Sequence, residues 1–291
     1  MDLTFTPEAI QRGGANPSRV DARVWLGTQG WHYKDWVGNF YPFGTQSRDM
    51  LTEYGRALST TEVDSTYYAT PPARSVEGWR RRTPAAFKFG LKTPSEITHV
   101  RRFRDADAQF DEFVDRARLL GDKLGAILVQ CPPDFDPTPE NRDALFHFMA
   151  HRLPKDCPIA LELRDGRWYD DDLFALARRH GFTIAATEGK YAPLSLANQI
   201  ADELVRDPPA PFAYLRWLGD RTLTVFDRVQ IERAESLDVW ERLIKQLRRS
   251  VRDIYGYVNN HYQGHSPATI RALAARLGEE IPPESTAPRL F

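Results

Sequence analysis

The sequence predicts a single-domain α/β protein of the (β/α)8-barrel class. Eight short apolar runs with strand character alternate with helical stretches along most of the chain, as expected of parallel strands joined by helical crossovers. The 291 residues, 42% of them hydrophobic, are enough to build one large core. No Gly-x-Gly-x-x-Gly loop follows the first strand, although an open nucleotide-binding sheet would normally carry one. The alternative is an open α/β sheet with an extra pair of strands.

The first four units are delimited by apolar periodicity and by Pro and Gly boundaries. Pro71 and Pro72 open the second helix, and Gly121 ends the third, which is amphipathic. Pro139 stands at the first position of the fourth helix. In order, the expected strand and helix of each unit are 24–28 with 47–58, 60–65 with 71–79, 87–92 with 106–120, and 126–130 with 139–151.

The last four units continue the alternation of strand and helix. In order, the expected pairs are 159–164 with 170–180, 183–187 with 196–205, 213–218 with 238–251, and 255–259 with 267–277. We therefore expect a barrel domain over 23–279, an extended or disordered arm over 1–22, and a Pro-containing tail over 280–291.

Composition excludes several protein classes. The 39 basic and 40 acidic residues give a formal net charge of -1, so the whole chain carries no electrostatic signal for nucleic acid or a membrane surface. Cys131 and Cys157 are too few for a disulfide framework and suit reduced thiols. No apolar run approaches the ~20 residues of a membrane span, and the first 21 residues lack the apolar core of a signal peptide. We expect a cytoplasmic protein with no membrane partner.

Charged side chains at the strand ends predict a site. Glu162 and Arg164 lie two residues apart in an otherwise apolar strand, so both point to one face. Active sites of barrels lie at the carboxyl-terminal ends of the strands. Three carboxylates and four cations in such positions would neutralise one another and leave a slight positive bias. A buried structural ion network is the simpler alternative. The polar residues in question are Glu62, Asp64, Lys88, Lys92, Gln130, Glu162, Arg164, Arg216, Asn259 and Asn260.

Several ordered blocks resemble the YecE-like family, whose members carry domain of unknown function seventy-two. Asp64 stands where that family usually has Asn, and Leu218 where many members have His. The resemblance covers 25–277 and implies a TIM-barrel-like fold with a pocket. The blocks are 27–36 (GTQGWHYKDW), 40–42 (FYP), 62–68 (EVDSTYY), 87–92 with 97–99, 130–135 (QCPPDF), 162–164 with Trp168, 214–219 (YLRWLG), and 259–260 with Gly264, His265 and Pro267.

The leading hypothesis is an enzyme, a hydrolase or a lyase or isomerase, that acts on a small phosphorylated or carboxylated substrate by acid-base chemistry. Arginine forks suit phosphate and carboxylate oxygens. The predicted catalytic residues are Glu62, Glu162 and Lys88. The predicted substrate-binding residues are Trp31, Tyr33, Asp64, Tyr68, Lys92, His99, Gln130, Arg164, Trp168, Arg216, Asn259, Asn260 and His265.

Other functions stay open. A glycoside hydrolase would pair Glu62 or Asp64 with Glu162 across ~5 to 10 Å. A metal-assisted phosphodiesterase or nuclease would add His99 and His265 as ligands, although neighbouring cations compete for the carboxylates. A non-catalytic anion-binding or scaffold protein needs only the pocket, and nucleic acid is a less favoured ligand that would stack on aromatic side chains. No cofactor motif is present, and a Schiff base at Lys88 or Lys92 requires burial to lower the lysine pKa.

Overall fold

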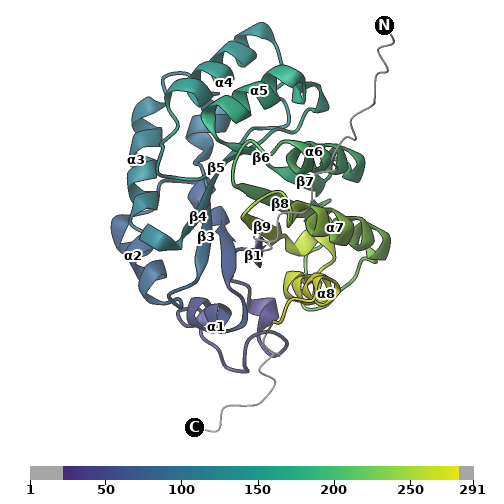
Figure 1. Ribbon diagram of the computed structural model, residues 1–291. Coiled ribbons are helices and arrows are strands. Elements are labelled where there is room, and N and C mark those ends of the chain that lie inside the picture. The colour runs from purple at the N-terminus through teal and green to yellow at the C-terminus, as the bar shows by residue number, and fades with distance from the viewer. Residues whose placement is uncertain (1–21, 282–291) are drawn as a thin grey trace, which may run out of the picture.

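The computed structural model describes residues 22–281, which form a nearly closed parallel barrel surrounded by helices (Figure 1). The predicted fold class is confirmed. The arm expected over 1–22 and the tail expected over 280–291 lie outside the described residues, apart from their innermost positions. No helix of residues 22–281 is long and apolar enough to cross a membrane.

All strands in this part of the chain run parallel, in the order β6-β5-β4-β3-β2-β1-β9-β8-β7. The first and last members of that order, β6 and β7, are separated in the chain only by Ala185. β6 pairs with β5 and β7 pairs with β8, so the expected sixth strand bends and closes the barrel with its two halves. The strands are β1 (Arg23–Gln29), β2 (Thr60–Val63), β3 (Lys88–Lys92), β4 (Leu124–Gln130), β5 (Ile159–Glu162), β6 (Thr183–Ile184), β7 (Ala186–Gly189), β8 (Phe212–Gly219) and β9 (Asp253–Val258).

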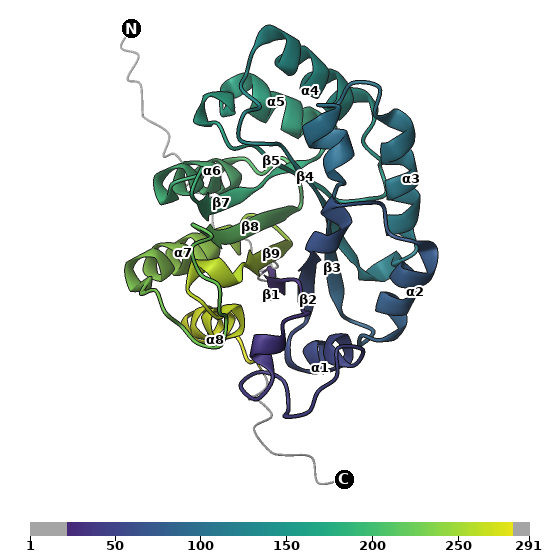
Figure 2. The same ribbon diagram turned by 180° about the vertical axis from the view of Figure 1, so that it is seen from behind.

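The helices surround the strands in chain order, from α1 at the bottom through α4 and α5 at the top and back to α8 (Figures 1 and 2). α4 begins as expected because the Thr138 side chain accepts from the Asn141 backbone N–H and Pro139 fills the first turn. The helices are α1 (Met50–Ala57), α2 (Ala73–Arg81), α3 (Asp107–Arg118), α4 (Pro139–His151), α5 (Asp171–His180), α6 (Leu194–Arg206), α7 (Ala234–Leu247) and α8 (Ser266–Leu277).

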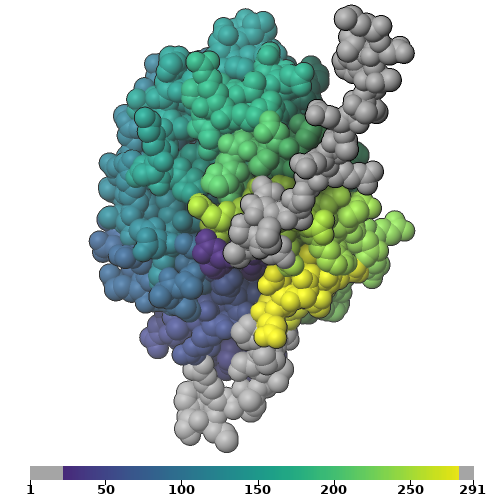
Figure 3. Space-filling view, in the orientation of Figure 1, coloured from purple at the N-terminus to yellow at the C-terminus, as the bar shows by residue number. Residues whose placement is uncertain are grey.

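Two apolar layers hold the barrel. The larger lies between strands and helices and contains buried aromatic residues such as Trp240. The smaller fills the barrel interior on the amino-terminal side of the strand ends. There Tyr214 and Tyr257 cross the barrel, and small side chains face them. At Gly90 a Cβ would lie 2.8 Å from the Tyr214 hydroxyl, so this position of β3 leaves room for the tyrosines. In the space-filling view the first half of the chain covers one side of the molecule and the second half the other (Figure 3).

Alternation along the strands then places a polar layer above the tyrosines. Tyr214 and Arg216 are two residues apart on β8, as Ala160 and Glu162 are on β5. β8 and β5 therefore each present an apolar side chain deeper in the barrel and a charged one nearer the carboxyl-terminal end of the strand. This layer is the floor of the site described next.

Candidate functional site

The floor of the site is a buried ion network centred on Arg216. This side chain is 2% exposed, and both of its carboxylate partners are fully buried. Its Nε and Nη2 donate to Glu62 at 2.9 and 2.6 Å, and its Nη1 donates to Glu162 Oε2 at 2.5 Å. One guanidinium from β8 thus links carboxylates from β2 and β5 across the barrel.

The remaining carboxylate positions are also occupied. The Tyr214 hydroxyl donates to Glu62 Oε2 at 2.7 Å. Arg164 Nε donates to Glu162 Oε1 at 3.1 Å, and Thr187 Oγ1 donates to Glu162 Oε2 at 3.1 Å. Both buried carboxylates therefore have charge-assisted partners on each oxygen, which is how a polar network in the interior becomes tolerable.

The surroundings of the two glutamates shift their pKa values in opposite directions. Burial opposes ionisation of Glu162, but the Arg216 and Arg164 guanidinium groups outweigh it and lower its pKa to about 2. Among the described residues, Arg216 is the only cationic hydrogen-bond partner of Glu62. Burial, with a smaller contribution from Asp64, raises the pKa of Glu62 above its ordinary value. A carboxyl group whose pKa is about 2 is a weak base at neutral pH. Glu162 is better suited to positioning the two arginines than to transferring a proton.

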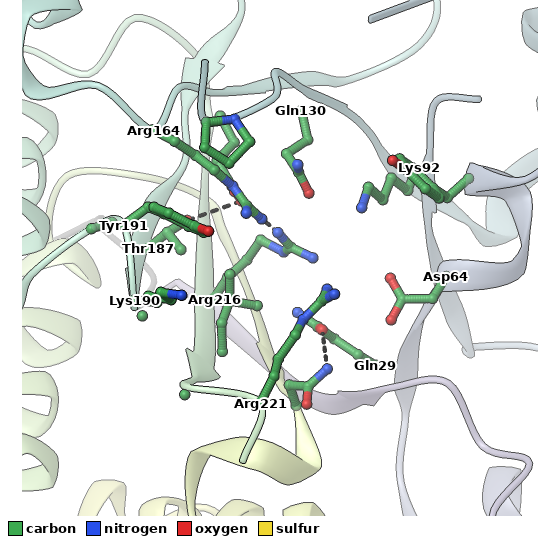
Figure 4. A pocket seen from close by; sticks show the side chains of 18 of the residues that line it. Gln29, Asp64, Lys92, Gln130, Arg164, Thr187, Lys190, Tyr191, Arg216 and Arg221 are labelled. Atoms are coloured by element: carbon green, nitrogen blue, oxygen red, sulfur yellow. Dashed lines mark hydrogen bonds and ion pairs between the residues drawn. The ribbon is translucent and has the colours of Figure 1, made fainter. Parts of the chain in front are cut away.

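Above this floor lies a cavity of about 410 Å³ at the carboxyl-terminal ends of the strands. The side chains of Asp64, Lys92, Gln130 and Arg221 point towards a common open space in front of Arg216 (Figure 4). The predicted residues that line it are Asp64, Tyr68, Lys92, His99, Gln130, Glu162, Arg164, Arg216 and Asn259.

Lys92 is unusual among the cavity residues. Its side chain is buried and its Nζ lies 4.1 Å from the centre of the Tyr67 ring, yet it makes no hydrogen bond or ion pair with any residue from 22 to 281. Burial and the nearby Arg216 lower its pKa to about 8. At neutral pH an appreciable fraction of this amine is therefore uncharged.

Gln130 presents a second unmet polar group to the cavity. It is 3% exposed, and its Nε2 donates to the Cys131 backbone oxygen at 3.2 Å. Its Oε1 has no hydrogen-bond partner within the described residues. A buried amide oxygen in this state is available to a ligand hydroxyl or N–H group.

His99 borders the cavity from a π-helical turn, Glu96–Val100. Burial and the nearby Lys92 lower its pKa to about 4, so the ring is neutral at pH 7. Just beyond this turn Arg102, Phe103 and Asp105 have positive φ angles of 47°, 68° and 50°. Single π turns and strained backbone both occur preferentially at functional sites.

Two exposed cations on the rim were absent from the predicted set. Lys190 follows β7 and Arg221 follows β8, and neither forms an ion pair with another described residue. Lys190 lies 5.4 Å from the Tyr191 ring centre, and Arg221 has a φ of 58°. Gln29, Thr187 and Tyr191 also line the cavity and were missed. Gln29 and Thr187 could have been identified by their position at strand ends. Loop residues carry no periodic pattern by which the sequence would identify them.

The prediction that Lys88 lies in the site is wrong. It shares the inward phase of Lys92 on β3 but stands at the first residue of the strand, where its Nζ donates to the Asp122 backbone oxygen and lies 5.9 Å from the Trp25 ring centre. Four residues of strand span roughly 13 Å. Of the charged strand-end residues, Glu62, Glu162, Arg164 and Arg216 come together in one ion network. Lys88 lies at the opposite end of the barrel.

Five predicted binding residues pack behind the cavity and do not line it. Trp31 meets Trp79 edge-on at 6.0 Å, and the Tyr33 hydroxyl donates to the Gln29 backbone oxygen. Trp168 is fully buried and donates to the Phe135 backbone oxygen at 2.6 Å. The other two are Asn260, whose Oδ1 accepts from the Ser266 backbone N–H at the start of α8, and His265, which packs edge-on against Trp36.

No group of three or more His, Cys, Asp or Glu side chains in the described part of the chain converges as metal ligands would. His99 lies on the rim, and His265 is buried beside Trp36 away from the cavity. The ligand set considered for a metal-assisted reaction is thus not assembled by this arrangement.

Comparison with known proteins gives concordant matches. The UPF0759 protein YunF of Bacillus subtilis (strain 168) is 26% identical over 264 residues, covering 83% of this chain and 90% of that protein. A DUF72 family protein of Thermotoga maritima has a TM-score of 0.72 at 24% identity, covering 88% of this chain and all of that one. A DUF72 family protein of Enterococcus faecalis has a TM-score of 0.67 at 19% identity, covering 89% and 99%. A family model described as "Protein of unknown function DUF72" matches residues 25–290, so the chain belongs to the DUF72 family, as its resemblance to YecE-like proteins indicated.

Proposed function

We propose that the protein is an enzyme that binds a small phosphorylated or carboxylated substrate in this cavity and acts on it by acid-base chemistry. The observation that carries the proposal is the set of cationic side chains around the cavity that have no carboxylate partner among residues 22–281: Lys92, Lys190 and Arg221. An anion entering the cavity would provide the missing partner.

The buried network supports the same function. Arg216 and Arg164 already neutralise Glu62 and Glu162, so these carboxylates repel an incoming anion only weakly. A glycoside hydrolase instead needs two carboxyl groups free to act on either side of a scissile bond. Because both glutamates are held by guanidinium groups, the geometry favours anion handling over sugar hydrolysis.

The acid-base role falls to Lys92 and Asp64 in this proposal, in place of Glu62, Glu162 and Lys88. Both side chains point into the cavity from the ends of neighbouring strands (Figure 4). The pKa of Lys92 is about 8, close to neutral pH, where a proton-transfer group is most effective. Asp64 makes no ion pair with any other described side chain and supplies the complementary carboxylate.

Thermal denaturation in the presence of phosphorylated metabolites, short oligonucleotides and neutral oligosaccharides tests the proposal. We expect the melting temperature to rise with small phosphorylated compounds, because a ligand that binds only the native state stabilises it. Arg221→Ala and Lys190→Ala should each weaken that binding about 3- to 10-fold by removing one exposed charge contact.

Matched controls are Arg249→Ala and Lys155→Ala, two exposed cations on loops that precede β9 and β5 at the opposite end of the barrel. These variants should bind anions as the wild type does. Stabilisation only by neutral glycans would contradict the proposal. If anions stabilise all four variants equally, the anion does not bind in this cavity and the proposed site is wrong. Binding without turnover of any stabilising compound would indicate a sensor instead of an enzyme.

A further inference from the structure

Two buried lysines with the same exposure have opposite surroundings. Lys123 and Lys92 are each 8% exposed. Lys123 Nζ donates to the backbone oxygens of Arg80 and Thr83 at 2.6 and 2.7 Å and to Thr83 Oγ1 at 3.1 Å, as a structural lysine should. Within residues 22–281, Lys92 Nζ makes no hydrogen bond or ion pair and lies over the face of the Tyr67 ring. A buried amine without partners is costly to keep, which points to a use for the amine itself.

The position of Lys92 suits a nucleophile. It is the last residue of β3, so a rigid strand fixes its backbone while its amine faces the cavity (Figure 4). A lysine amine attacks carbonyl carbons when it is uncharged, and desolvation or a nearby cation favours that form. Burial and Arg216 provide both conditions here and bring the pKa to about 8.

We propose that Lys92 forms a Schiff base with an aldehyde, ketone or 2-oxo group of a substrate that also carries a phosphate or carboxylate. The proposal rests on the function proposed above and specifies its substrate class. Arg221 and Lys190 would hold the anionic group at the rim, which leaves the carbonyl carbon deeper in the cavity near Lys92. A cavity of about 410 Å³ suits a compound of this size.

The chemistry balances with groups already in the cavity. The Nζ lone pair attacks the carbonyl carbon, the C=O π electrons move to oxygen, and proton transfers give a neutral carbinolamine. Protonation of its hydroxyl expels water while the nitrogen lone pair forms the C=N bond of the iminium ion. Asp64 is placed to accept the amine proton and return it to the departing hydroxyl. The unsatisfied Gln130 Oε1 can accept a hydrogen bond from a substrate hydroxyl.

Reductive trapping tests the inference, since cyanoborohydride converts an iminium ion to a stable secondary amine. The full-length protein is incubated with dihydroxyacetone phosphate or pyruvate plus cyanoborohydride, digested, and mapped by mass spectrometry. The sequence has seven lysines, so each site can be followed. We expect labelling at Lys92 at least about ten-fold above that at exposed Lys155, because burial and Arg216 lower the pKa of Lys92 to about 8 and favour its uncharged amine.

Variants and analogues make the result specific. Lys92→Arg keeps the charge but should lose the adduct, whereas Lys88→Arg, at the other end of β3, should retain it. Because labelling is mapped in the wild type, the answer does not depend on either variant folding, and Lys92→Met offers a second replacement. Glycerol 3-phosphate and lactate carry the anions but no reactive carbonyl, so they should compete with labelling and form no adduct.

The outcomes separate this inference from the proposed function. Thermal stabilisation by both glycerol 3-phosphate and dihydroxyacetone phosphate without any Lys92 adduct would overturn the Schiff base and leave anion binding intact. No stabilisation and no adduct would overturn both. Labelling spread equally over the lysines, and unchanged in Lys92→Arg, would also overturn the Schiff base.

Discussion

Lys92 should destabilise the fold that it serves. Its folded-state pKa of about 8 lies below the ordinary 10.5, so the unfolded chain binds more protons between those pH values. The penalty is therefore full below pH 8 and is relieved as pH rises to 10.5. We predict that Lys92→Met raises the free energy of unfolding at pH 7 by about 1 to 3 kcal/mol while abolishing any activity. Urea denaturation at pH 7 and pH 10.5 measures the difference, which should shrink at the higher pH.

Lys123→Met is the matched control, because it removes a lysine of equal exposure that makes three hydrogen bonds. It should lower stability by leaving buried backbone oxygens unsatisfied. If Lys92→Met destabilises the protein as much as Lys123→Met, Lys92 has a structural partner and the functional interpretation of its amine is wrong.

Glu162, in contrast to Lys92, should stabilise the folded protein. Glu162→Gln leaves Arg216 and Arg164 with too few carboxylates, so we predict a loss of about 3 to 5 kcal/mol at pH 7. The Glu162 pKa is depressed to about 2, so its contribution is complete above the unfolded value near 4.3 and is lost as pH falls through 2.

Chemical denaturation of the wild type and Glu162→Gln from pH 7 to pH 2 checks this window. The two stabilities should converge as the carboxylate of the wild type becomes protonated. A constant difference across the whole range would show that Glu162 is held by packing and not by its charge.

At the level of elements, Gly219 couples β8 to the loop that bears Arg221. Its φ is +70°, and a Cβ there would lie 2.1 Å from the His261 backbone oxygen. Gly219→Ala combines left-handed strain with a backbone clash, so we predict a loss of at least about 2 to 3 kcal/mol and weaker anion binding. Urea denaturation and thermal shift with glycerol 3-phosphate measure the two effects.

Gly181 separates strain from clash. It caps α5 with a φ of +73°, but apart from its neighbours along the chain no atom of residues 22–281 lies within 4 Å of a Cβ built there. Gly181→Ala should cost only about 1 kcal/mol, the price of a left-handed alanine. Equal losses in the two variants would mean that the contact between Gly219 and His261 relaxes freely.

The bounds of an element were predictable where a local sequence signal marks its start or its end. α4 has the expected bounds because Thr138 and Pro139 fix its start. The strand expected over 60–65 ends instead at Val63, because Thr66 Oγ1 donates to the Val63 and Lys92 backbone oxygens and holds a 3-10 turn, Asp64–Tyr67. The hydrogen bond from Thr66 to Lys92 on the neighbouring strand leaves no mark in the periodicity of the sequence. α7 starts at Ala234, ahead of the expected 238, since Leu237 is already buried.

At the level of the whole molecule, the alternation of side chains along a strand predicts which of them face the barrel interior. It does not predict how far along the barrel axis each side chain lies. Glu62, Glu162 and Arg216 were found because family-like blocks and strand ends coincide at them. Lys88 has the correct face and the wrong end, because it stands at the start of its strand and the site lies at the carboxyl-terminal ends. Lys190 and Arg221 come from loops whose course is set by tertiary packing.

The central claim is that Lys92 presents a reactive amine in an anion-binding cavity, and competitive acetylation of the lysines tests it most directly. Trace acetic anhydride is applied from pH 6 to pH 11 with and without glycerol 3-phosphate, and peptides are quantified by mass spectrometry. Lys92 should titrate with a midpoint of about 8, and the anion should protect it while Lys88 is unaffected. A Lys92 that titrates near the ordinary lysine value of 10.5, and whose acetylation is the same with and without the anion, would contradict the account.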